Sequence, residues 1–241
     1  MATFILVHGA WHGGWCWEEI APALTGHGHR VLAPDLPGMG EDAASGHVAS
    51  LDEWAMFIAG MASASAEPAV LVGHSRGGIV ISRAAELAPR AVKRLVYLAA
   101  VMALPGESMD TLVGSFAPAG KSPLADAVGV APDGRTSICH GRQAAIDSFY
   151  NSCPPDKAEA AFARLTPEPI AMRTSPVVLT AQRYGTIPRS YIRCEQDRAL
   201  PPALQDYMIA RQPCEVVLLN ADHSPFYSAP EELTGLLHAA A

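Results

Sequence analysis

Short hydrophobic runs alternate with longer helical patterns along the first 100 residues. The runs are rich in β-branched and apolar residues, which is typical of buried strands, and the stretches between them are long enough for helices. This alternation predicts a parallel sheet covered by helices. The predicted strands are Phe4 to Val7, Arg30 to Ala33, Ala69 to Gly73 and Arg94 to Leu98.

One helix between these strands is indicated by its first residues as well as by its periodicity. Ser50 followed by Glu53 forms a capping box, which satisfies free amides at a helix start. Apolar residues then recur at one-face helical spacing from Leu51 to Ile58. We therefore expect a helix from about Leu51 to Ala64.

The pattern changes from Leu104 to about Tyr184, where prolines are frequent and the strand-helix alternation is lost. Alternation resumes with strands at Ser190 to Arg193 and Glu215 to Leu219, a helix from Pro202 to Arg211, and a last helix opened by Pro230. We interpret residues 104–185 as an inserted cap. Residues 1–103 and 186–241 then form a single α/β core.

Composition narrows the class of protein. The 241 residues are 49% hydrophobic and 17% charged, so the chain can bury a sizeable core. The net charge is −7 and the 17 basic residues form no run, which argues against nucleic acid as a partner. The five cysteines have neither zinc-site nor disulfide-framework spacing. We expect reduced thiols and no metal.

The start of the chain gives no targeting signal. Its apolar run, Phe4 to Val7, is far too short for a signal peptide or a membrane span, and it leads directly into glycines. We expect a cytoplasmic protein without a membrane partner. No nucleotide-binding glycine pattern is present, so no cofactor is expected.

The candidate nucleophile lies in a Gly-x-Ser-x-Gly motif. Gly73, Ser75 and Gly77 occupy its fixed positions, after a predicted strand and before a predicted helix. In this setting the serine sits on a sharp, strained turn that projects its hydroxyl above the sheet. The alternative is a glycine-rich turn with a capping serine.

The residue after the nucleophile supplies one candidate oxyanion donor. The Arg76 amide lies at a helix N-terminus, where a free N–H and the helix dipole stabilise negative charge. The glycine-rich loop after the first strand offers a second donor, the Ala10 amide. The Arg76 side chain has two candidate roles, contact with an anionic substrate group or, as favoured here, pairing with a carboxylate of the cap.

A serine nucleophile needs a base, and the motif's chain order places a histidine beyond a late strand. His223 fits that place, whereas His74 is expected to pack on the other side of the turn. Asp197 follows the penultimate strand and is the candidate triad acid. Glu195 competes with it, Asp222 is too close in sequence to His223, and Asp206 should face outward on a helix.

An apolar substrate pocket is expected, although each candidate wall residue also fits ordinary core or cap packing. The candidates are Trp11, Met102, Phe116, Phe149, Tyr150 and Phe226.

Read together, these segments resemble the plant methylesterase and hydroxynitrile lyase family, which includes salicylic acid-binding methyl esterases and related bacterial esterases. The resemblance spans essentially the whole chain. It is carried by residues 6–17 (LVHGAWHGGWCW), 31–40 (VLAPDLPGMG), 72–78 (VGHSRGG), 97–102 (YLAAVM) and 221–226 (ADHSPF).

The resemblance implies an α/β-hydrolase fold with a compact helical cap and a triad of Ser75, Asp197 and His223. It also implies oxyanion amides at Ala10 and Arg76, and a homodimer as a common assembly. In the resembled family, the lyases look to carry a threonine after the first-loop histidine and a lysine after the catalytic histidine. Gly9 and Ser224 stand there instead, which favours ester hydrolysis.

The predicted function is therefore hydrolysis of small alkyl or aryl carboxylic esters by a serine esterase. The alternatives are lyase-type C–C cleavage, hydrolysis of a lactone or amide, and a non-catalytic receptor for a small ligand.

Overall fold

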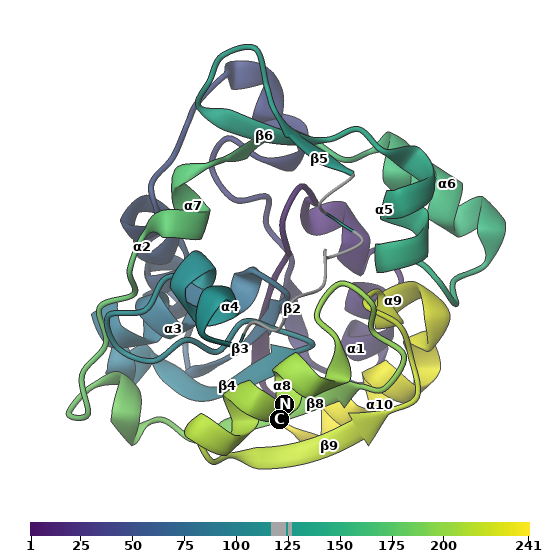
Figure 1. Ribbon diagram of the computed structural model, residues 1–241. Coiled ribbons are helices and arrows are strands. Elements are labelled where there is room, and N and C mark those ends of the chain that lie inside the picture. The colour runs from purple at the N-terminus through teal and green to yellow at the C-terminus, as the bar shows by residue number, and fades with distance from the viewer. Residues whose placement is uncertain (117–123, 125–126) are drawn as a thin grey trace.

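The computed structural model describes residues 1–116, 124 and 127–241. Within this part of the chain, the centre is a six-stranded parallel sheet with the order β2-β1-β3-β4-β8-β9 (Figure 1). The strands are β1 (Thr3–Val7), β2 (Arg30–Leu32), β3 (Ala69–His74), β4 (Val92–Leu98), β8 (Arg189–Cys194) and β9 (Glu215–Leu219). The predicted α/β class is confirmed.

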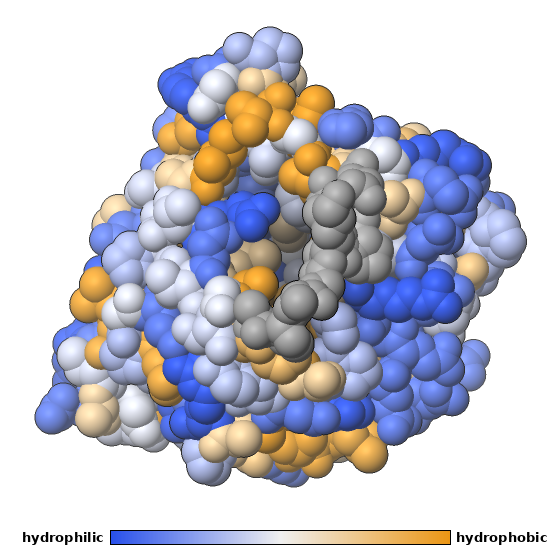
Figure 2. All heavy atoms as spheres, in the orientation of Figure 1, coloured by the Kyte–Doolittle hydropathy of each residue, from blue (hydrophilic) through white to orange (hydrophobic). Residues whose placement is uncertain are grey.

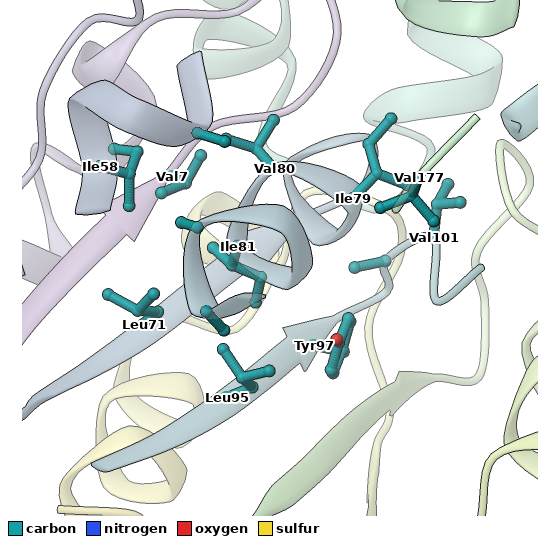
Figure 3. Packing of buried hydrophobic residues seen from close by; sticks show 14 of the residues in the cluster. Val7, Ile58, Leu71, Ile79, Val80, Ile81, Leu95, Tyr97, Val101 and Val177 are labelled. Carbon is teal, nitrogen blue, oxygen red and sulfur yellow. The ribbon is translucent and has the colours of Figure 1, made fainter. Parts of the chain in front are cut away.

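Helices cover both faces of this sheet because its strands direct alternate side chains to opposite sides. Ile5 and Val7 of β1 face a cluster shared with α2, α3 and α8, whereas Phe4 and Leu6 face one shared with α1 and α10. Figure 3 shows the first cluster, where Ile58 of α2 and Ile81 of α3 pack over the sheet. These helices are α1 (Ile20–Gly26), α2 (Leu51–Ser63), α3 (Gly77–Leu87), α8 (Pro202–Arg211) and α10 (Pro230–Ala239).

The start of α2 agrees with its predicted cap. The Ser50 hydroxyl accepts a hydrogen bond from the Glu53 amide at 3.2 Å, and the helix begins at Leu51. The helices α8 and α10 begin at Pro202 and Pro230, where a missing N–H costs no hydrogen bond.

The chain between β4 and β8, residues 99–188, is called here the β4–β8 segment. Its described part contains α4 (Met109–Phe116), α5 (Arg142–Phe149), α6 (Pro155–Ala163) and α7 (Ala171–Thr174). It also contains an antiparallel sheet of β5 (Val128–Val130), β6 (Thr136–Cys139) and β7 (Glu168–Pro169). The expectation of a helical insertion was therefore incomplete, because strands this short and proline-flanked leave no readable alternation.

Glycine at position 78 lets α3 approach the loop after β4. A Cβ atom added there would lie 2.3 Å from the Val101 carbonyl oxygen, whereas one added at Gly235 of α10 would meet open space. We expect Gly78→Ala to lower the free energy of unfolding by about 1–3 kcal/mol through overpacking. Gly235→Ala should raise it by about 0.5–1 kcal/mol through helix propensity. Urea unfolding of both variants measures this difference, and equal stabilities would contradict the close approach.

Candidate active site

The carboxyl ends of the central strands bring the predicted site residues to one edge of the sheet. Ser75 follows β3, Asp197 follows β8, His223 follows β9, and Ala10 lies in the loop after β1. Parallel strands end at the same edge, which is where open α/β sheets bind ligands. Figure 2 shows a hollow in the face above this edge, with hydrophobic residues gathered over β5 and β6.

The backbone at Ser75 adopts the conformation expected of a nucleophile on a sharp turn. Its φ angle is 52°, in the left-handed region that residues with a side chain rarely enter. The Ser75 amide donates to the Leu98 carbonyl, and the Ser75 carbonyl accepts from the amides of Gly78 and Val101. These bonds from β4, its following loop and α3 hold the strained turn in place.

Glycines flank this turn because backbone crosses backbone there. A Cβ atom at Gly73 would lie 2.7 Å from the Gly77 carbonyl oxygen, and one at Gly77 would lie 2.7 Å from the carbonyl oxygen of Val7. The β3–α3 turn therefore packs directly on the end of β1.

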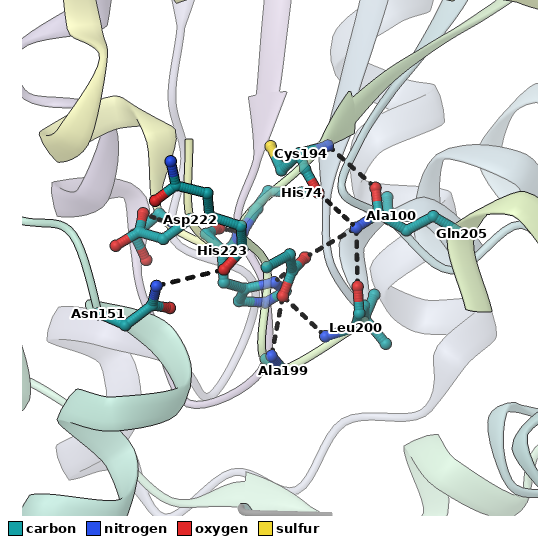
Figure 4. A network of polar contacts seen from close by, with 12 residues as sticks. His74, Ala100, Asn151, Cys194, Ala199, Leu200, Gln205, Asp222 and His223 are labelled. Carbon is teal, nitrogen blue, oxygen red and sulfur yellow. Dashed lines mark hydrogen bonds and ion pairs between the residues drawn. The ribbon is translucent and has the colours of Figure 1, made fainter. Parts of the chain in front are cut away.

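His223 and Asp197 form a buried pair. The distance from His223 Nδ1 to Asp197 Oδ2 is 2.8 Å, and the two side chains are 2% and 0% exposed. The other carboxylate oxygen, Oδ1, accepts the amides of Ala199 and Leu200, and Gln205 Nε2 donates to Oδ2 at 3.2 Å (Figure 4). An acceptor surrounded only by donors suits an ionised carboxylate that orients an imidazole.

The loop that carries His223 is held by hydrogen bonds to the end of β3 and to the β4–β8 segment. His74 Nε2 donates to the His223 carbonyl at 2.7 Å, and the His74 side chain is fully buried, as predicted. Asp222 accepts the amides of Ser224 and Ser152 (Figure 4 shows Asp222 beside His223). Sequence reasoning missed both positioning roles, since the His223 carbonyl is 149 positions from His74 and the Ser152 amide is 70 positions from Asp222.

The competing acids lie elsewhere. Glu195 is exposed, and Asp206 on α8 pairs with Arg193 with 56% of its side chain exposed. Among the described residues, the hydrogen-bond donors to the Asp222 carboxylate are the two amides above, the Cys153 thiol and the Ser228 hydroxyl, and not the His223 ring.

The amides of Ala10 and Arg76 are free to bind a ligand oxygen. Arg76 has φ −53° and ψ −29° and lies at the N-cap of α3, and Ala10 is 8% exposed. Neither amide donates a hydrogen bond to another residue that the structure describes. Free N–H groups at such a turn are the usual donors of an oxyanion hole.

The Arg76 side chain points away from solvent. Its Nε donates to Glu168 Oε2 of β7 at 2.9 Å, and the two side chains are 0% and 3% exposed. Trp54 of α2 covers the guanidinium, with the ring centroid 4.3 Å from Cζ. Of the two roles predicted for this side chain, the structure therefore shows pairing with a carboxylate of the β4–β8 segment.

The predicted apolar walls divide into two groups. Trp11 and Phe149 lie beside the site, with ring centroids 6.0 Å apart and Phe149 5.7 Å from the His223 ring; Tyr150 adjoins Phe149 at 5.9 Å. Of the remaining candidates, Phe226 and Met102 are almost fully buried. The sequence cannot distinguish an aromatic or Met residue in the core from one that lines a pocket, because both are apolar positions in the same pattern. The contacts of the remaining candidates are Phe226 on Trp17, the Met102 amide on Met208 Sδ, and Phe116 on Tyr207.

His12 is a further residue that the sequence did not single out. Its Nδ1 donates to the Ala10 carbonyl at 2.7 Å, and its Nε2 accepts the Tyr150 hydroxyl at 2.8 Å. His8 is placed similarly, with Nδ1 donating to the Gly9 carbonyl and Nε2 accepting the Leu36 amide. The His8 ring is therefore neutral, because a proton on Nε2 would face the Leu36 N–H. Burial favours the neutral form of His12, whose Nε2 then accepts from Tyr150.

These buried imidazoles predict acid sensitivity. Burial lowers the pKa of His12 to about 4 and lowers the pKa of His8 and His74 well below the ordinary value. Below about pH 6.5 these imidazoles bind protons in the unfolded chain but stay neutral in the folded chain. The free energy of unfolding therefore falls as pH falls. We expect up to about 1.4 kcal/mol of loss per pH unit for each ring. Urea unfolding at pH 7, 6 and 5 measures it, and an equal free energy at all three would contradict neutral burial.

Within the described residues, no group of His, Cys, Asp and Glu side chains is arranged to hold a metal ion. Among the helices of the same residues, none is both long and apolar enough to cross a membrane.

Comparison with known proteins decides the family. Residues 4–236 match the alpha/beta hydrolase family. The chain belongs to this family. This alpha/beta hydrolase is 32% identical to methylesterase 18 of Arabidopsis thaliana, in an alignment that covers 99% of this chain and 96% of the methylesterase. It is 30% identical to norfluorocurarine synthase 1 of a Strychnos species, in an alignment that covers 99% of this chain and 94% of the synthase. The resemblance to plant methylesterases is thus confirmed.

Solved structures of other alpha/beta hydrolases have the same architecture. A pyrethroid hydrolase from Sphingobium faniae JZ-2 superposes with a TM-score of 0.87 at 29% identity, covering 99% of this chain and 96% of that chain. Some relatives are longer: this alpha/beta hydrolase spans 55% to 62% of the length of several putative chloroplastic methylesterases of Arabidopsis thaliana.

Proposed function

We propose that this alpha/beta hydrolase is a serine esterase that cleaves small alkyl or aryl carboxylic esters through an acyl-enzyme. The observation that carries the proposal is the buried His223–Asp197 pair, 2.8 Å apart, at the same sheet edge as Ser75 on its strained turn. The names of its relatives, methylesterases and a pyrethroid hydrolase, support ester hydrolysis as the reaction class.

In the proposed acylation step, Ser75 Oγ attacks the ester carbonyl carbon while His223 Nε2 takes the hydroxyl proton. Asp197 holds the other ring nitrogen and stabilises the imidazolium that forms. The amides of Ala10 and Arg76 bind the oxyanion of the tetrahedral intermediate. The intermediate then collapses, the C–O bond breaks, and His223 protonates the leaving alcohol.

Deacylation repeats these roles with water. His223 removes a proton from water as it attacks the acyl-serine, the same amides bind the second oxyanion, and the proton returns to Ser75 as the acid leaves. Each step needs only the residues named here.

The surroundings of His223 support an apolar substrate group. Trp11 and Phe149 present aromatic surface beside the imidazole and are 6% and 3% exposed. An alkyl or aryl group packed there would gain from burial, at about 25 cal/mol for each Å² removed from water.

The packing at Gly9 disfavours a lyase. A Cβ atom at this position would lie 2.9 Å from Ser75 Cβ and 2.9 Å from His74 Nδ1. A threonine, the residue that lyases of the resembled family carry there, would displace the nucleophile or His74. Ser224, where those lyases carry lysine, is fully buried and places no cation beside His223.

Hydrolysis of a substrate panel tests the proposal. The panel contains p-nitrophenyl esters from acetate to decanoate, aryl methyl esters, a γ-lactone, a p-nitroanilide and mandelonitrile, with and without EDTA. We expect cleavage of short esters, unchanged by EDTA, and a mass increase equal to one acyl group when the enzyme is quenched during turnover. Cleavage of the anilide, lactone or mandelonitrile with no ester cleaved would move the function to that class, and binding without turnover would make the protein a receptor.

A further inference from the structure

The buried ion pair of Arg76 and Glu168 connects three separate parts of the chain. Arg76 comes from the nucleophile turn and Glu168 from β7 of the β4–β8 segment. Arg76 also donates from Nη2 to the Gly9 carbonyl at 2.8 Å, in the loop after β1. The catalytic steps proposed above do not use this side chain.

The Gly9 carbonyl belongs to the peptide that carries the Ala10 amide. Peptide bonds in the described residues are trans, so the C=O and N–H of this unit point in opposite directions. Fixing the carbonyl therefore fixes where the Ala10 N–H points. Arg76 Nη2 and His8 Nδ1, at 2.8 and 2.9 Å, both donate to this carbonyl.

The Arg76 guanidinium on the Gly9 carbonyl also changes how strongly the Ala10 N–H of the same peptide donates. A charge-assisted hydrogen bond to a carbonyl draws electron density from the peptide nitrogen, which makes its N–H a better donor. Arg76 is fully buried, so water does not screen this effect. The same residue thus offers its own amide to the site and polarises the neighbouring one.

Glu168 fixes the next residue of the loop. Its Oε2 accepts the Trp11 amide at 3.2 Å in addition to Arg76 Nε. Trp11 has a φ of 58°, a left-handed conformation that costs energy and persists only where the surroundings hold it. Ser137 Oγ accepts Trp11 Nε1 at 3.1 Å, and the Thr166 amide donates to the Trp11 carbonyl. Strands β6 and β7, together with Thr166, therefore hold the turn at Trp11 in place.

A contribution to folding stability does not explain well why Arg76 and Glu168 are buried as an ion pair. Taking two charges out of water offsets most of their attraction, and well-packed apolar replacements are often neutral or stabilising. The pair contributes direction and polarity at the Gly9–Ala10 peptide, which an apolar pair of similar volume cannot supply.

We propose that Arg76 and Glu168 are positioning residues of the oxyanion hole, acting through the Gly9–Ala10 peptide and the Trp11 backbone. This inference rests on the proposed esterase function. It adds a role for a residue of the β4–β8 segment in the chemical step.

The test compares the double variant R76L/E168L with the wild type, using p-nitrophenyl acetate and a trifluoromethyl ketone whose adduct with Ser75 carries an oxyanion. We expect kcat to fall about 10- to 100-fold, less than the 10²–10³-fold typical for loss of an oxyanion donor. The affinity for the ketone should fall by a similar factor, while KM changes less than about threefold. R76K, which keeps the charge, should recover part of the lost kcat.

The matched control is R83L/D52L, which removes an ion pair between α3 and α2 with an N–O distance of 2.7 Å. It should keep kcat within about twofold of the wild type. If R76L/E168L changes only the melting temperature or KM, the pair is merely structural and the proposal is wrong. Should the double variant not fold, E168Q, which keeps the side-chain volume, decides by the same kcat criterion.

A readout without turnover separates this inference from the proposed function. The Ala10 amide nitrogen of the free, folded protein should resonate upfield in R76L/E168L, or in E168Q if the double variant does not fold, and stay in place in R83L/D52L. If the wild type cleaves no ester but this shift occurs, the esterase function fails and the positioning holds. If esters are cleaved and neither the shift nor kcat changes, the positioning fails and the function holds.

Discussion

Ser75→Ala is expected to lower kcat for a p-nitrophenyl ester by about 10⁶-fold, the loss typical when the nucleophile of such a triad is removed. The substitution deletes only the hydroxyl oxygen, and alanine adopts the φ of 52° at the same cost as serine. The Leu98 and Val101 hydrogen bonds of the turn involve backbone alone and remain. Activity should therefore vanish without loss of the fold.

Initial rates with stopped-flow detection measure this loss, and near-ultraviolet circular dichroism checks the fold. Ser63→Ala, at the exposed end of α2, is the matched control and should retain full activity. Ester cleavage by Ser75→Ala within tenfold of the wild type would remove Ser75 from the mechanism.

Asp197→Asn is expected to lower kcat by about 10⁴-fold. The amides of Ala199 and Leu200 both donate to Oδ1, so the new amide oxygen must stay at that position. Its NH₂ group then replaces Oδ2 and faces His223 Nδ1. An NH₂ that donates to Nδ1 places the ring proton on Nε2, and such a ring cannot accept the proton of Ser75.

Gln205 opposes this placement, because its Nε2 also donates to Oδ2 and would face the new NH₂. The two backbone amides on Oδ1 outweigh this one side-chain donor, which also has the Cys194 and Leu200 carbonyls as acceptors. Asp206→Asn on α8 is the matched control, since this carboxylate is exposed and pairs only with Arg193 among the described residues. It should leave kcat within about twofold. Activity of Asp197→Asn comparable to that of the control would show that another group orients the histidine.

Local patterns explain why much of this molecule could be predicted. Strands β1 and β3 are buried, largely apolar runs bounded by turns, and α2 carries its capping box within its first residues. The Gly-x-Ser-x-Gly motif and the chain order after successive strands predict Ser75, Asp197 and His223, and the parallel sheet brings such positions to one edge. Each of these signals is contained within a few residues.

The remaining features depend on contacts between residues far apart in sequence. Glu168 meets Arg76 across 92 positions and Trp11 across 157. Nothing near Glu168 distinguishes it from a surface carboxylate, which is the ordinary place for that residue type. Strands β6 and β7 likewise pair across about 30 positions, Thr136 with Pro169 and Ser137 with Glu168.

The contacts of Trp11 limit how this enzyme's specificity can be re-engineered. Exchanging residues 99–188 for the corresponding stretch of a relative would change the side chains beside the proposed substrate site, but it would also remove Ser137 and Glu168 from the turn at Trp11. A chimera that lacks a hydroxyl and a carboxylate at these points should bind new substrates yet turn them over slowly. Libraries that vary this stretch while keeping both side chains should therefore contain more active clones than libraries that vary it freely.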